Sequence, residues 1–389
     1  MSEFRTIREL CSVVVDCPHS TPKWTANGKI VIRNKNIKHG KIDFSSPSYT
    51  DDEHFAQRIK RAKPQPGDII ITREAPIGDV GMIPENTECC LGQRMVLLRA
   101  NQSVCDNFYL LYSLQSLYVQ HQISWSEGTG TTVSNLRIPH LEQIQIPYLP
   151  LEQQAKISSV LRALEEKIEN NRRLNDNLQQ QAFSVFDNLI ANAENNDYTV
   201  SDYAFLNPKR TLAKNQVARS IDMSQLSTSG AFPSGWEMKP FNGGMRFTNG
   251  DTLLARITPC LENGKTAFID FLDDGEVAFG STEYIVLAPK NDTPPEMLYC
   301  LARYPAFVDY AVKNMNGSSG RQRVSAETVG QYRLPLFDKH SLVLFKEVVS
   351  PMFLKMRYNS LENMRLAELR DALLPKLMSG EIDVSAVQL

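Results

Sequence analysis

The sequence lacks any long apolar run, and its first residues lack the features of a secretion signal. No stretch approaches the roughly 18 to 20 consecutive apolar residues that span a bilayer. The opening residues MSEFRTIREL show no charged start followed by an apolar run and a small-residue cleavage site. We therefore expect a cytoplasmic protein. A chain of 389 residues fits two or three domains, each with its own core.

Metal-binding and redox motifs and a surplus of positive charge are also missing. The seven cysteines are an odd number and include no CxxC pair, so we expect neither a zinc site nor a redox centre. The formal net charge is -2, whereas a protein that coats nucleic acid indiscriminately needs a large basic surplus. Any basic residues that contact nucleic acid must therefore be arranged locally.

Catalytic motifs are absent as well. An amino-methyltransferase needs Asn or Asp followed by Pro-Pro and an aromatic residue, and the nearest candidates, residues 207–209 and 293–296, both fail. No cofactor-binding GxGxxG follows a strand. Residues 264–266, Gly-Lys-Thr, cannot end a phosphate-binding loop because Pro259 stands where its first glycine is required. We predict a non-catalytic protein without cofactor or metal.

The strongest positive feature is an internal repeat, in which the second half of the chain matches the first at an offset of 183 to 189 residues. Residues 66–73 match residues 249–256, and each segment predicts a turn followed by a buried strand. The other landmarks are Gly92 with Gly280, Pro147 with Pro335, the apolar residues 95–98 with 284–287, and the Gly-rich residues 128–130 with 317–320. The repeat predicts two similar globular domains.

Each repeat ends in a segment with coiled-coil periodicity. Apolar residues alternate at spacings of four and three, and the same positions recur 188 residues later with Arg370 as the one charged exception. The positions of this seam are Ile157, Leu161, Leu164, Ile168, Leu178, Ala182, Val185 and Leu189, and then Phe345, Val349, Met352, Met356, Leu366, Arg370, Leu373 and Leu377. We predict two long helices that pack antiparallel.

Asparagine occupies the two positions that this seam skips in each helix. In an antiparallel pair, Asn171 would face the neighbourhood of Asn363, and Asn175 that of Asn359. Buried amides of this kind fix the register of a coiled coil, because a slipped pairing leaves them unsatisfied. The alternative interpretation is that all four lie on an exposed face of the helices.

The order of the segments predicts a domain, a helix, a second domain and a second helix. We expect a globular domain at 1–150, a spacer helix at 151–192, a second domain at 193–337, a second spacer helix at 338–380 and a tail at 381–389. With the helices antiparallel, the domains would lie at opposite ends of the spacer. A helical run of about 35 residues is on the order of 50 Å long, comparable with one to two turns of duplex DNA.

Several of these segments resemble the specificity (S) subunits of type I restriction-modification systems. Residues 249–265 followed by 280–287 are similar to the recognition-domain signature of that family. The first repeat resembles it through residues 32–37, 66–68 and 92–94, and the helical regions through residues 149–154, 369–377 and 379–382. The second helix lacks the Pro-x-Glu-Gln pattern that opens the first and begins instead near Phe337-Asp338-Lys339-His340, which leaves its start open.

The resemblance implies an α+β fold in which two target-recognition domains are separated by two long helices. It also implies that each domain reads one half of a gapped, bipartite site in double-stranded DNA. The helices would carry two modification subunits that methylate adenine, and a restriction subunit would join them. Two alternatives stay open: a specificity partner in a methylation-only or other nuclease system, and a structural coiled-coil adaptor that binds no DNA.

Residue chemistry suggests where DNA would be contacted. Phosphate contacts need lysine or arginine along a strand or loop, and base readout favours side chains with paired donors and acceptors. Two basic runs contain Lys29, Arg33, Lys35, Lys38 and Lys41, and Arg58, Lys60, Arg61 and Lys63. The predicted DNA-binding residues are Arg33, Lys35, Arg73, Gln93 and Arg94 in the first repeat, and Arg256, Thr282, Arg321 and Arg323 in the second. Alternatively, the basic runs are solvated faces, and Arg73 and Arg256 anchor strand ends to carboxylates.

Overall fold

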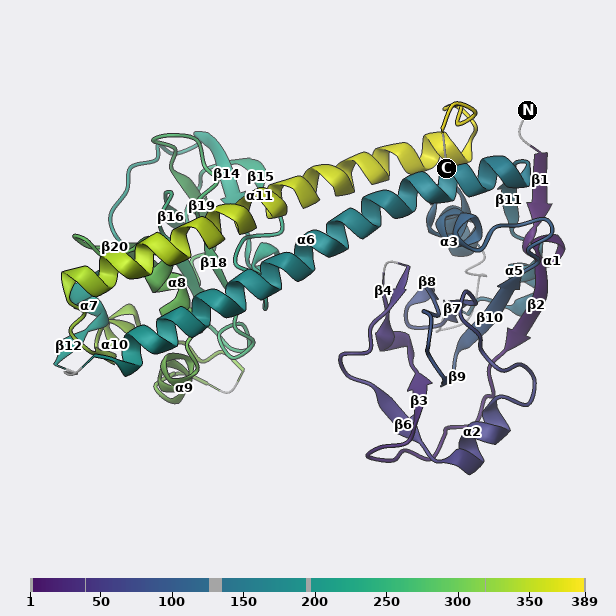
Figure 1. The fold of residues 1–389 in the computed structure, drawn as a ribbon, viewed down its shortest axis with the longest axis horizontal. Helices are drawn as coiled ribbons and strands as arrows, with labels where there is room; N and C mark the ends of the chain where they lie inside the picture. Colours follow the sequence, from purple (N-terminus) through teal and green to yellow (C-terminus); the bar gives the residue numbers. More distant parts are fainter. Residues whose placement is uncertain (1–2, 39, 126–134, 194–196, 319, 388–389) are drawn as a thin grey trace. The chain divides into compact units, whose positions relative to one another are not determined.

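The computed structural model describes residues 3–387 except 39, 126–134, 194–196 and 319 (Figure 1). Its packing divides the chain into two units. Unit 1 comprises Met1–Glu165 with Glu368–Leu389, and unit 2 comprises Glu166–Ala367. Each long helix therefore contributes one part to each unit, and the two units are described separately.

Unit 1 contains a mixed set of short strands and helices. Its strands are β1 (Glu3–Thr6), β2 (Cys11–Asp16), β3 (Lys29–Ile32), β4 (Ile37–Lys38), β5 (Lys41–Ile42), β6 (Ser48–Thr50), β7 (Ile69–Arg73), β8 (Ile77–Met82), β9 (Cys89–Leu91), β10 (Met95–Ala100) and β11 (Gln145–Tyr148). Its helices are α1 (Ile7–Leu10), η1 (Asn34–Asn36), α2 (Asp52–Arg58), α3 (Asn107–Gln115), α4 (Leu117–Trp125) and α5 (Ile138–Gln143). Two of these helices start where a short polar side chain caps them: Asp51 accepts from the His54 amide ahead of α2, and Asp106 from the Tyr109 amide ahead of α3.

Unit 2 has the same kinds of element. Its strands are β12 (Tyr198–Thr199), β13 (Ala204–Leu206), β14 (Val217–Ile221), β15 (Glu237–Pro240), β16 (Met245–Phe247), β17 (Thr252–Ala255), β18 (Thr266–Phe268), β19 (Ala278–Gly280), β20 (Tyr284–Pro289) and β21 (Arg333–Leu334). Its helices are α7 (Val200–Tyr203), η2 (Met223–Gln225), α8 (Pro295–Arg303), α9 (Pro305–Lys313) and α10 (Ala326–Gly330).

The two units share one strand topology, which confirms the expected α+β fold built twice. The sheet β2-β10-β7-β8 of unit 1 corresponds to β13-β20-β17-β18 of unit 2, and the pair β1-β11 corresponds to β12-β21. In each unit one parallel pair joins two distant segments, β3 with β9 and β14 with β19. The sequence repeat is therefore a repeat of structure.

Gly92 and Gly280 follow or end the second strand of these parallel pairs, and the packing there explains why both are glycine. A Cβ atom on Gly92 would lie 2.7 Å from the carbonyl oxygen of Ile32, and one on Gly280 would lie still closer to that of Ile221. Real Cβ atoms do not approach a backbone oxygen so closely. A larger residue would force the parallel strands apart.

The central strands are apolar throughout because both faces of their sheet are covered. In β7, Ile69 and Ile71 belong to the core formed with α3, whereas Ile70 belongs to the core beneath the β3-β9 sheet. In β17, Leu254 and Leu253 divide in the same way between two cores of unit 2. Strands buried on both faces have continuous apolar sequences, as these two do.

The long helices are α6 (Leu151–Ala191) and α11 (Lys339–Met378), with 41 and 40 residues. Every position of the predicted seam is buried or half-buried, Arg370 included. Within unit 2 the hydrogen bonds of Asn171 with Asn363 and of Asn175 with Asn359 run in opposite chain directions, so the helices pack antiparallel there. The two predicted long helices and their mutual packing are confirmed.

The start of α11 is fixed by a residue that differs from the start of α6. The carboxylate of Asp338 accepts hydrogen bonds from the amides of His340 and Ser341, so α11 begins directly after it. Ahead of α6 the equivalent residue is Pro150, which has no carboxylate, and in the first turn Gln154 donates to the carbonyls of Leu149 and Val104. The two helices therefore begin at equivalent positions, Leu151 and Lys339, although the Asp338 cap is not repeated.

The described residues include no helix that is both long and apolar enough to cross a membrane. All seven cysteines are free thiols, and every one except Cys260 is buried. Among the described residues, no group of three or more His, Cys, Asp or Glu side chains could hold a metal ion.

Candidate nucleic-acid interface

Three of the five predicted contacts of unit 1 meet at one edge of the sheet β2-β10-β7-β8. In the antiparallel register, Asp16 at the end of β2 pairs with Val96, and Thr72 near the end of β7 pairs with Met95. The ends of β2 and β7 and the start of β10 therefore lie together. This edge brings together Arg73, Gln93 and Arg94.

Arg73 is held tightly by its own unit. Its Nη1 lies 2.9 and 3.0 Å from the two carboxylate oxygens of Asp16, its Nε donates to the Leu136 carbonyl at 2.8 Å, and its Nη2 donates to Asn135 at 3.2 Å. Only 12% of its side chain is exposed. These contacts favour the alternative in which Arg73 anchors a strand end to a carboxylate.

Glu74 is the centre of a second set of contacts at the same edge. Its carboxylate accepts from Asn135 Nδ2 at 2.8 Å and pairs with Arg94 Nε at 3.2 Å, while its carbonyl accepts from Asn34 at 2.6 Å. Arg94 keeps 57% of its side chain exposed and has a φ of 65°. The edge thus presents one exposed guanidinium that a carboxylate holds near its base.

The remaining candidates of unit 1 differ in how they are held. Gln93 is half-buried and donates to the carbonyl of His19. Arg33 is exposed, with its guanidinium carbon 5.0 Å from the centre of the Trp24 ring, and Lys35 is exposed beside the Ser46 hydroxyl at 3.4 Å. Arg33 and Lys35 therefore keep charge at the surface.

The second basic run is corrected at Arg58. This residue is 6% exposed, and its guanidinium donates to four backbone carbonyls, those of Pro18, Ser20, Leu91 and Gly92. It is neither a phosphate contact nor part of a solvated face, because all of its donors point into the unit. Its role is to tie the segment after β2 to the turn between β9 and β10.

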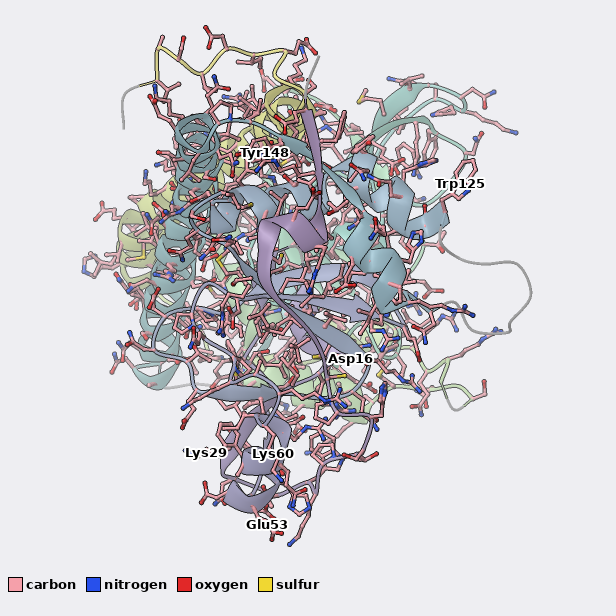
Figure 2. All side chains as sticks on the ribbon, turned by 90° about the vertical axis from the view of Figure 1, so that its right-hand side faces the viewer. Asp16, Lys29, Glu53, Lys60, Trp125 and Tyr148 are labelled. Atoms are coloured by element: carbon pink, nitrogen blue, oxygen red, sulfur yellow. The ribbon has the colours of Figure 1, made fainter. Side chains whose placement is uncertain are left out.

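Other basic residues in these runs are neutralised by one acidic side chain. Lys29 and Lys63 both pair with Glu88. Hydrogen bonds from Lys29 and Lys63 lower the pKa of Glu88 to about 2. Lys60, by contrast, is exposed just after α2 (Figure 2). The local positive charge is therefore smaller than the sequence suggests.

Unit 2 builds the equivalent edge with different side chains. Arg256 follows β17, and its amide donates to the Glu283 carbonyl at 3.0 Å just ahead of β20. The Glu283 carboxylate accepts from Arg323 Nε at 2.9 and 3.0 Å and from its Nη2 at 2.7 Å. These hydrogen bonds from Arg323 hold the pKa of Glu283 below its ordinary value. Arg256 is half-buried, and among the described polar atoms its Nε is buried without a hydrogen-bond partner.

The two edges differ in the sign of the charge at one equivalent position, which is Arg94 in unit 1 and Glu283 in unit 2. Arg94 and Glu283 occupy equivalent places before β10 and β20, and Asn135 and Arg323 occupy equivalent places in the segment that returns to each edge. Unit 1 carries its carboxylate on Glu74, whereas unit 2 carries it on Glu283. Each edge is closed by a similar ionic contact, but each offers a different set of donors and acceptors.

The Gly-rich segments are only partly described. Residues 128–130 lie outside the described residues, as does residue 319. Thr282 and Arg321 are exposed, and the Gln322 carbonyl accepts from the Thr258 amide at 3.0 Å. Arg323 keeps 40% of its side chain exposed despite its ion pair. Thr282, Arg321 and Arg323 are therefore accessible from solvent.

The repeated Gly-Asp motif has a structural role. Asp68 accepts from Arg99 at 2.7 Å and caps the turn at the Gln65 amide, and Asp251 accepts from Arg210 at 2.6 Å. Burial raises the pKa of Asp251 to about 6, against the opposing hydrogen bonds from the Thr248 amide and Arg210. These carboxylates hold the turn before each central strand.

The seam asparagines meet in the pairs expected from the sequence. Asn171 Nδ2 donates to Asn363 Oδ1 at 2.9 Å, and Asn359 Nδ2 donates to Asn175 Oδ1 at 2.8 Å. Asn171 and Asn359 are 4% and 1% exposed. The alternative of an exposed face does not fit these two residues, although a role in fixing register stays a prediction.

Sequence reasoning missed Asp16, Glu74 and Asn135, which position the arginines of unit 1. Acidic and amide side chains carry no signal for nucleic acid by themselves. A signal was nevertheless available, because alignment of the repeats sets Arg94 against Glu283 and Asn135 against Arg323. Such an exchange indicates that the aligned positions interact with charged neighbours.

Comparisons with known proteins agree along the chain. A family model described as the type I restriction modification DNA specificity domain matches residues 3–180. The type I restriction enzyme MjaIX specificity subunit of Methanocaldococcus jannaschii is 22% identical over 373 residues, which cover 82% of this chain and 78% of that protein. The type I restriction enzyme EcoAI specificity subunit of Escherichia coli is 33% identical over 133 residues, or 32% of this chain and 22% of that one.

Two further comparisons concern a partial relative and a solved structure. The putative MjaX specificity subunit of M. jannaschii is 30% identical over 123 residues, and the match spans only 28% of that relative's length. The crystal structure of the type I restriction-modification S subunit from M. genitalium superimposes with a TM-score of 0.56 at 19% identity and covers 96% of this chain and 95% of that one. The fold is therefore shared over nearly the whole chain.

Proposed function

Because this chain belongs to the DNA specificity subunits of type I restriction-modification systems, we propose that it reads a gapped, bipartite site in double-stranded DNA, one half with each unit. The observation that carries the proposal is the duplicated strand edge, where the same framework presents different polar side chains. Two versions of one reading surface suit two different half-sites. The chain is the non-catalytic member of such a system and supplies sequence specificity.

In unit 1 we assign base readout first to Arg94. A guanidinium with most of its surface exposed can donate two hydrogen bonds to the O6 and N7 atoms of guanine in the major groove. Glu74 would orient it, while Gln93 lies next to it in the chain. Arg33 and Lys35 are assigned to phosphates, because both are exposed cations on the same unit.

In unit 2 we assign readout to Thr282, Arg321 and Arg323. All three keep exposed surface around the start of β20 and the segment that approaches it. Arg73 and Arg256 are kept in the binding surface as residues that fix strand ends, since Arg73 has little exposed surface. The two units are thus expected to prefer different bases.

The long helices are proposed to set the distance between the half-sites. A helix of 41 residues at about 1.5 Å per residue is roughly 60 Å long. Successive half-sites on one face of a duplex are separated by about 34 to 36 Å or a multiple of it. We assign 1–150 and 193–337 to target recognition, 151–192 and 338–380 to the spacer, and 381–389 to a tail.

The helices are also proposed to carry two adenine-methylating modification subunits, with the restriction subunit joining the same assembly. A specificity partner in a methylation-only or other nuclease system would use the same surfaces. A structural adaptor that binds no DNA is the third possibility. Neither alternative explains the duplicated edge better than two half-sites do.

The test is to coexpress the chain with the modification subunit of its system and map methylated adenines by single-molecule sequencing. We expect a gapped motif with two short specified halves around a fixed spacer. Methylation at an ungapped motif would contradict two reading units. A stable complex that neither methylates nor binds any DNA sequence selectively would favour the adaptor.

A further inference from the structure

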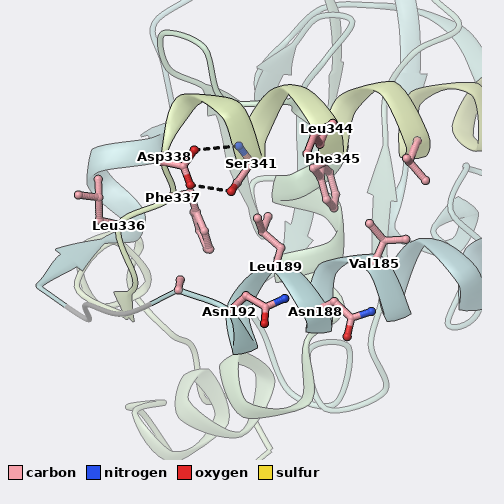
Figure 3. Close-up of a pocket in the computed structure, with 12 residues that line it drawn as sticks. Val185, Asn188, Leu189, Asn192, Leu336, Phe337, Asp338, Ser341, Leu344 and Phe345 are labelled. Atoms are coloured by element: carbon pink, nitrogen blue, oxygen red, sulfur yellow. Dashed lines mark hydrogen bonds between the residues drawn. The ribbon is translucent and has the colours of Figure 1, made fainter.

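Unit 2 has an open apolar groove between the last turns of α6 and the first turns of α11. Figure 3 shows Val185 and Leu189 of α6 on one side, with Leu344 and Phe345 of α11 on the other. The groove encloses about 630 Å³. Three aliphatic side chains at this groove are nearly half exposed: Leu336 at 46%, and Leu344 and Val348 each at 47%.

Unit 1 contains the equivalent place, and there it is covered by the tail that follows α11. The positions 188 residues before Leu344 and Val348 are Lys156 and Val160, and neither is exposed. The Nζ of Lys156 donates to the Ser385 carbonyl of the tail at 2.9 Å. The tail thus lies directly over the residue equivalent to Leu344.

The tail attaches through aliphatic side chains. Val384 is 4% exposed and belongs to the core of unit 1, and the half-buried Ile382 and Val387 pack against the same core. A hydrogen bond from the Val387 amide to the Val384 carbonyl turns the chain so that these side chains share one face. An Ile-x-Val-x-x-Val segment therefore fits this kind of groove.

The linker of unit 2 has no such side chains. Residues 192–197, which join α6 to the β12 strand, read Asn-Ala-Glu-Asn-Asn-Asp, with nothing aliphatic larger than alanine. Half-exposed aliphatic side chains clustered in a groove mark a binding surface more often than a solvated one. The groove therefore occurs in both units, but an aliphatic segment that can cover it follows only α11, in unit 1.

We propose that the groove of unit 2 binds a short aliphatic segment of a partner protein, with the side-chain chemistry of this chain's own tail. Leu344 stands where Lys156 contacts the tail carbonyl, so the partner segment makes an apolar contact there. Asn188 and Asn192 of α6 also line the groove, so its α6 side includes amides that can bond to the backbone of an extended segment. This proposal does not depend on which DNA sequence is read.

A different chain fits better than a second copy of this one. Each copy has one tail, and that tail already covers the groove of its own unit 1. Moving it to a neighbouring copy would expose Val384 and Ile382 in order to cover Leu344 and Val348. The exchange gains little apolar burial and adds the entropic cost of association.

The test uses a synthetic peptide of residues 380–389 with a photoreactive residue in place of Ala386, which is exposed in the tail. The peptide is crosslinked to the full-length chain and the labelled residues are mapped by mass spectrometry. We expect labels on the last turns of α6 and the first turns of α11. Leu344→Asp should weaken labelling about tenfold, because a charge replaces a leucine that the peptide would bury.

Val343→Asp is the matched control, because Val343 is 44% exposed on the same helix but does not line the groove. Equal loss of labelling in both variants, or no label in the groove at millimolar peptide, would overturn the proposal. Labels confined to the neighbourhood of Lys156 would also overturn it, since the peptide would then only replace the tail. A concentration-dependent dimer in light scattering that Leu344→Asp abolishes would make the occupant a second copy and refute the assignment to a different chain.

Discussion

Replacing the seam asparagines by leucine tests whether they fix the register of the long helices at a cost in stability. Asn359 is 1% exposed, and its amide donates to Asn175 at 2.8 Å. In Asn359→Leu, burial of a leucine contributes roughly 1.5 to 3 kcal/mol. The half-buried Asn175 carbonyl loses its partner, which costs about 1 to 3 kcal/mol. The two contributions offset each other, so the free energy of unfolding of the single variant should lie within about 1 kcal/mol of that of the wild type.

The variant with leucine at both Asn359 and Asn175 removes that orphaned carbonyl. It loses the further bonds from Asn175 to Met356 and Ser360, which at 3.3 and 3.2 Å are long. We expect the free energy of unfolding of this double variant to rise by about 1.5 to 3 kcal/mol, and by about twice that when Asn171 and Asn363 are also replaced by leucine. Chemical denaturation of the single, double and quadruple variants, followed by circular dichroism, measures these differences.

Register is measured separately with a zero-length carbodiimide crosslink. Lys167 and Glu362 form an ion pair of 3.2 Å across the two helices, and a slip by one heptad would move them about 10 Å apart. The wild type should give this crosslink alone, whereas the quadruple variant should lose part of it and gain crosslinks to other acidic residues. A quadruple variant that loses more than 2 kcal/mol while keeping the single crosslink would refute the register argument.

Four further substitutions test other parts of the structure. Arg58→Ala should cost about 3 to 5 kcal/mol in chemical denaturation, because it strands the carbonyls that the guanidinium satisfies; a loss below 1 kcal/mol would contradict the assigned role. Hydrogen bonds from Arg323 lower the pKa of Glu283, so the stability that this carboxylate contributes is present above its unfolded pKa of about 4.3 and lost as pH falls below it. The advantage of wild type over Glu283→Gln should therefore shrink between pH 7 and pH 3, and a constant difference would argue against the ion pair. Arg94→Ala should change the preferred base in one half-site only, whereas Lys35→Ala should weaken binding to all sequences alike, as measured by selection from randomised DNA; the reverse pattern would exchange their roles.

Those parts of the fold that repeat along the chain could be predicted from the sequence. The seam positions recur at one offset, and the structure buries them in both α6 and α11. The sequence shows Gly92 and Gly280 as repeated glycines, but it does not show why glycine is required at these positions. That cause is the approach of the Ile32 and Ile221 carbonyls from strands distant in the sequence.

Arg58 shows why the rest could not be predicted. In the sequence it is one cation in a basic run, and basic runs are ordinarily solvated. Its partners are backbone carbonyls in the segment after β2 and around the end of β9, which lie 33 to 40 residues away, and carbonyls carry no side-chain signal. Only the tertiary arrangement of α2 against β9 brings them together. A charge pattern alone cannot separate a buried arginine that holds loops from an exposed one that contacts phosphate.

At the two strand edges, the residues that hold the fold are distinct from the residues assigned to DNA contacts. The glycines, the Gly-Asp turns and the parallel strand pairs are the same in both units, and all of them lie in or against the cores. The charged residues at the edge differ between the units. An ion pair joins Glu74 to Arg94 in unit 1, whereas in unit 2 an ion pair joins Glu283, which stands at the position of Arg94, to Arg323. Because the exchange leaves the core untouched, the residues at either edge can change what one unit prefers without changing how it folds. Two half-sites with unrelated sequences are therefore what a duplicated framework with unmatched edges is expected to read.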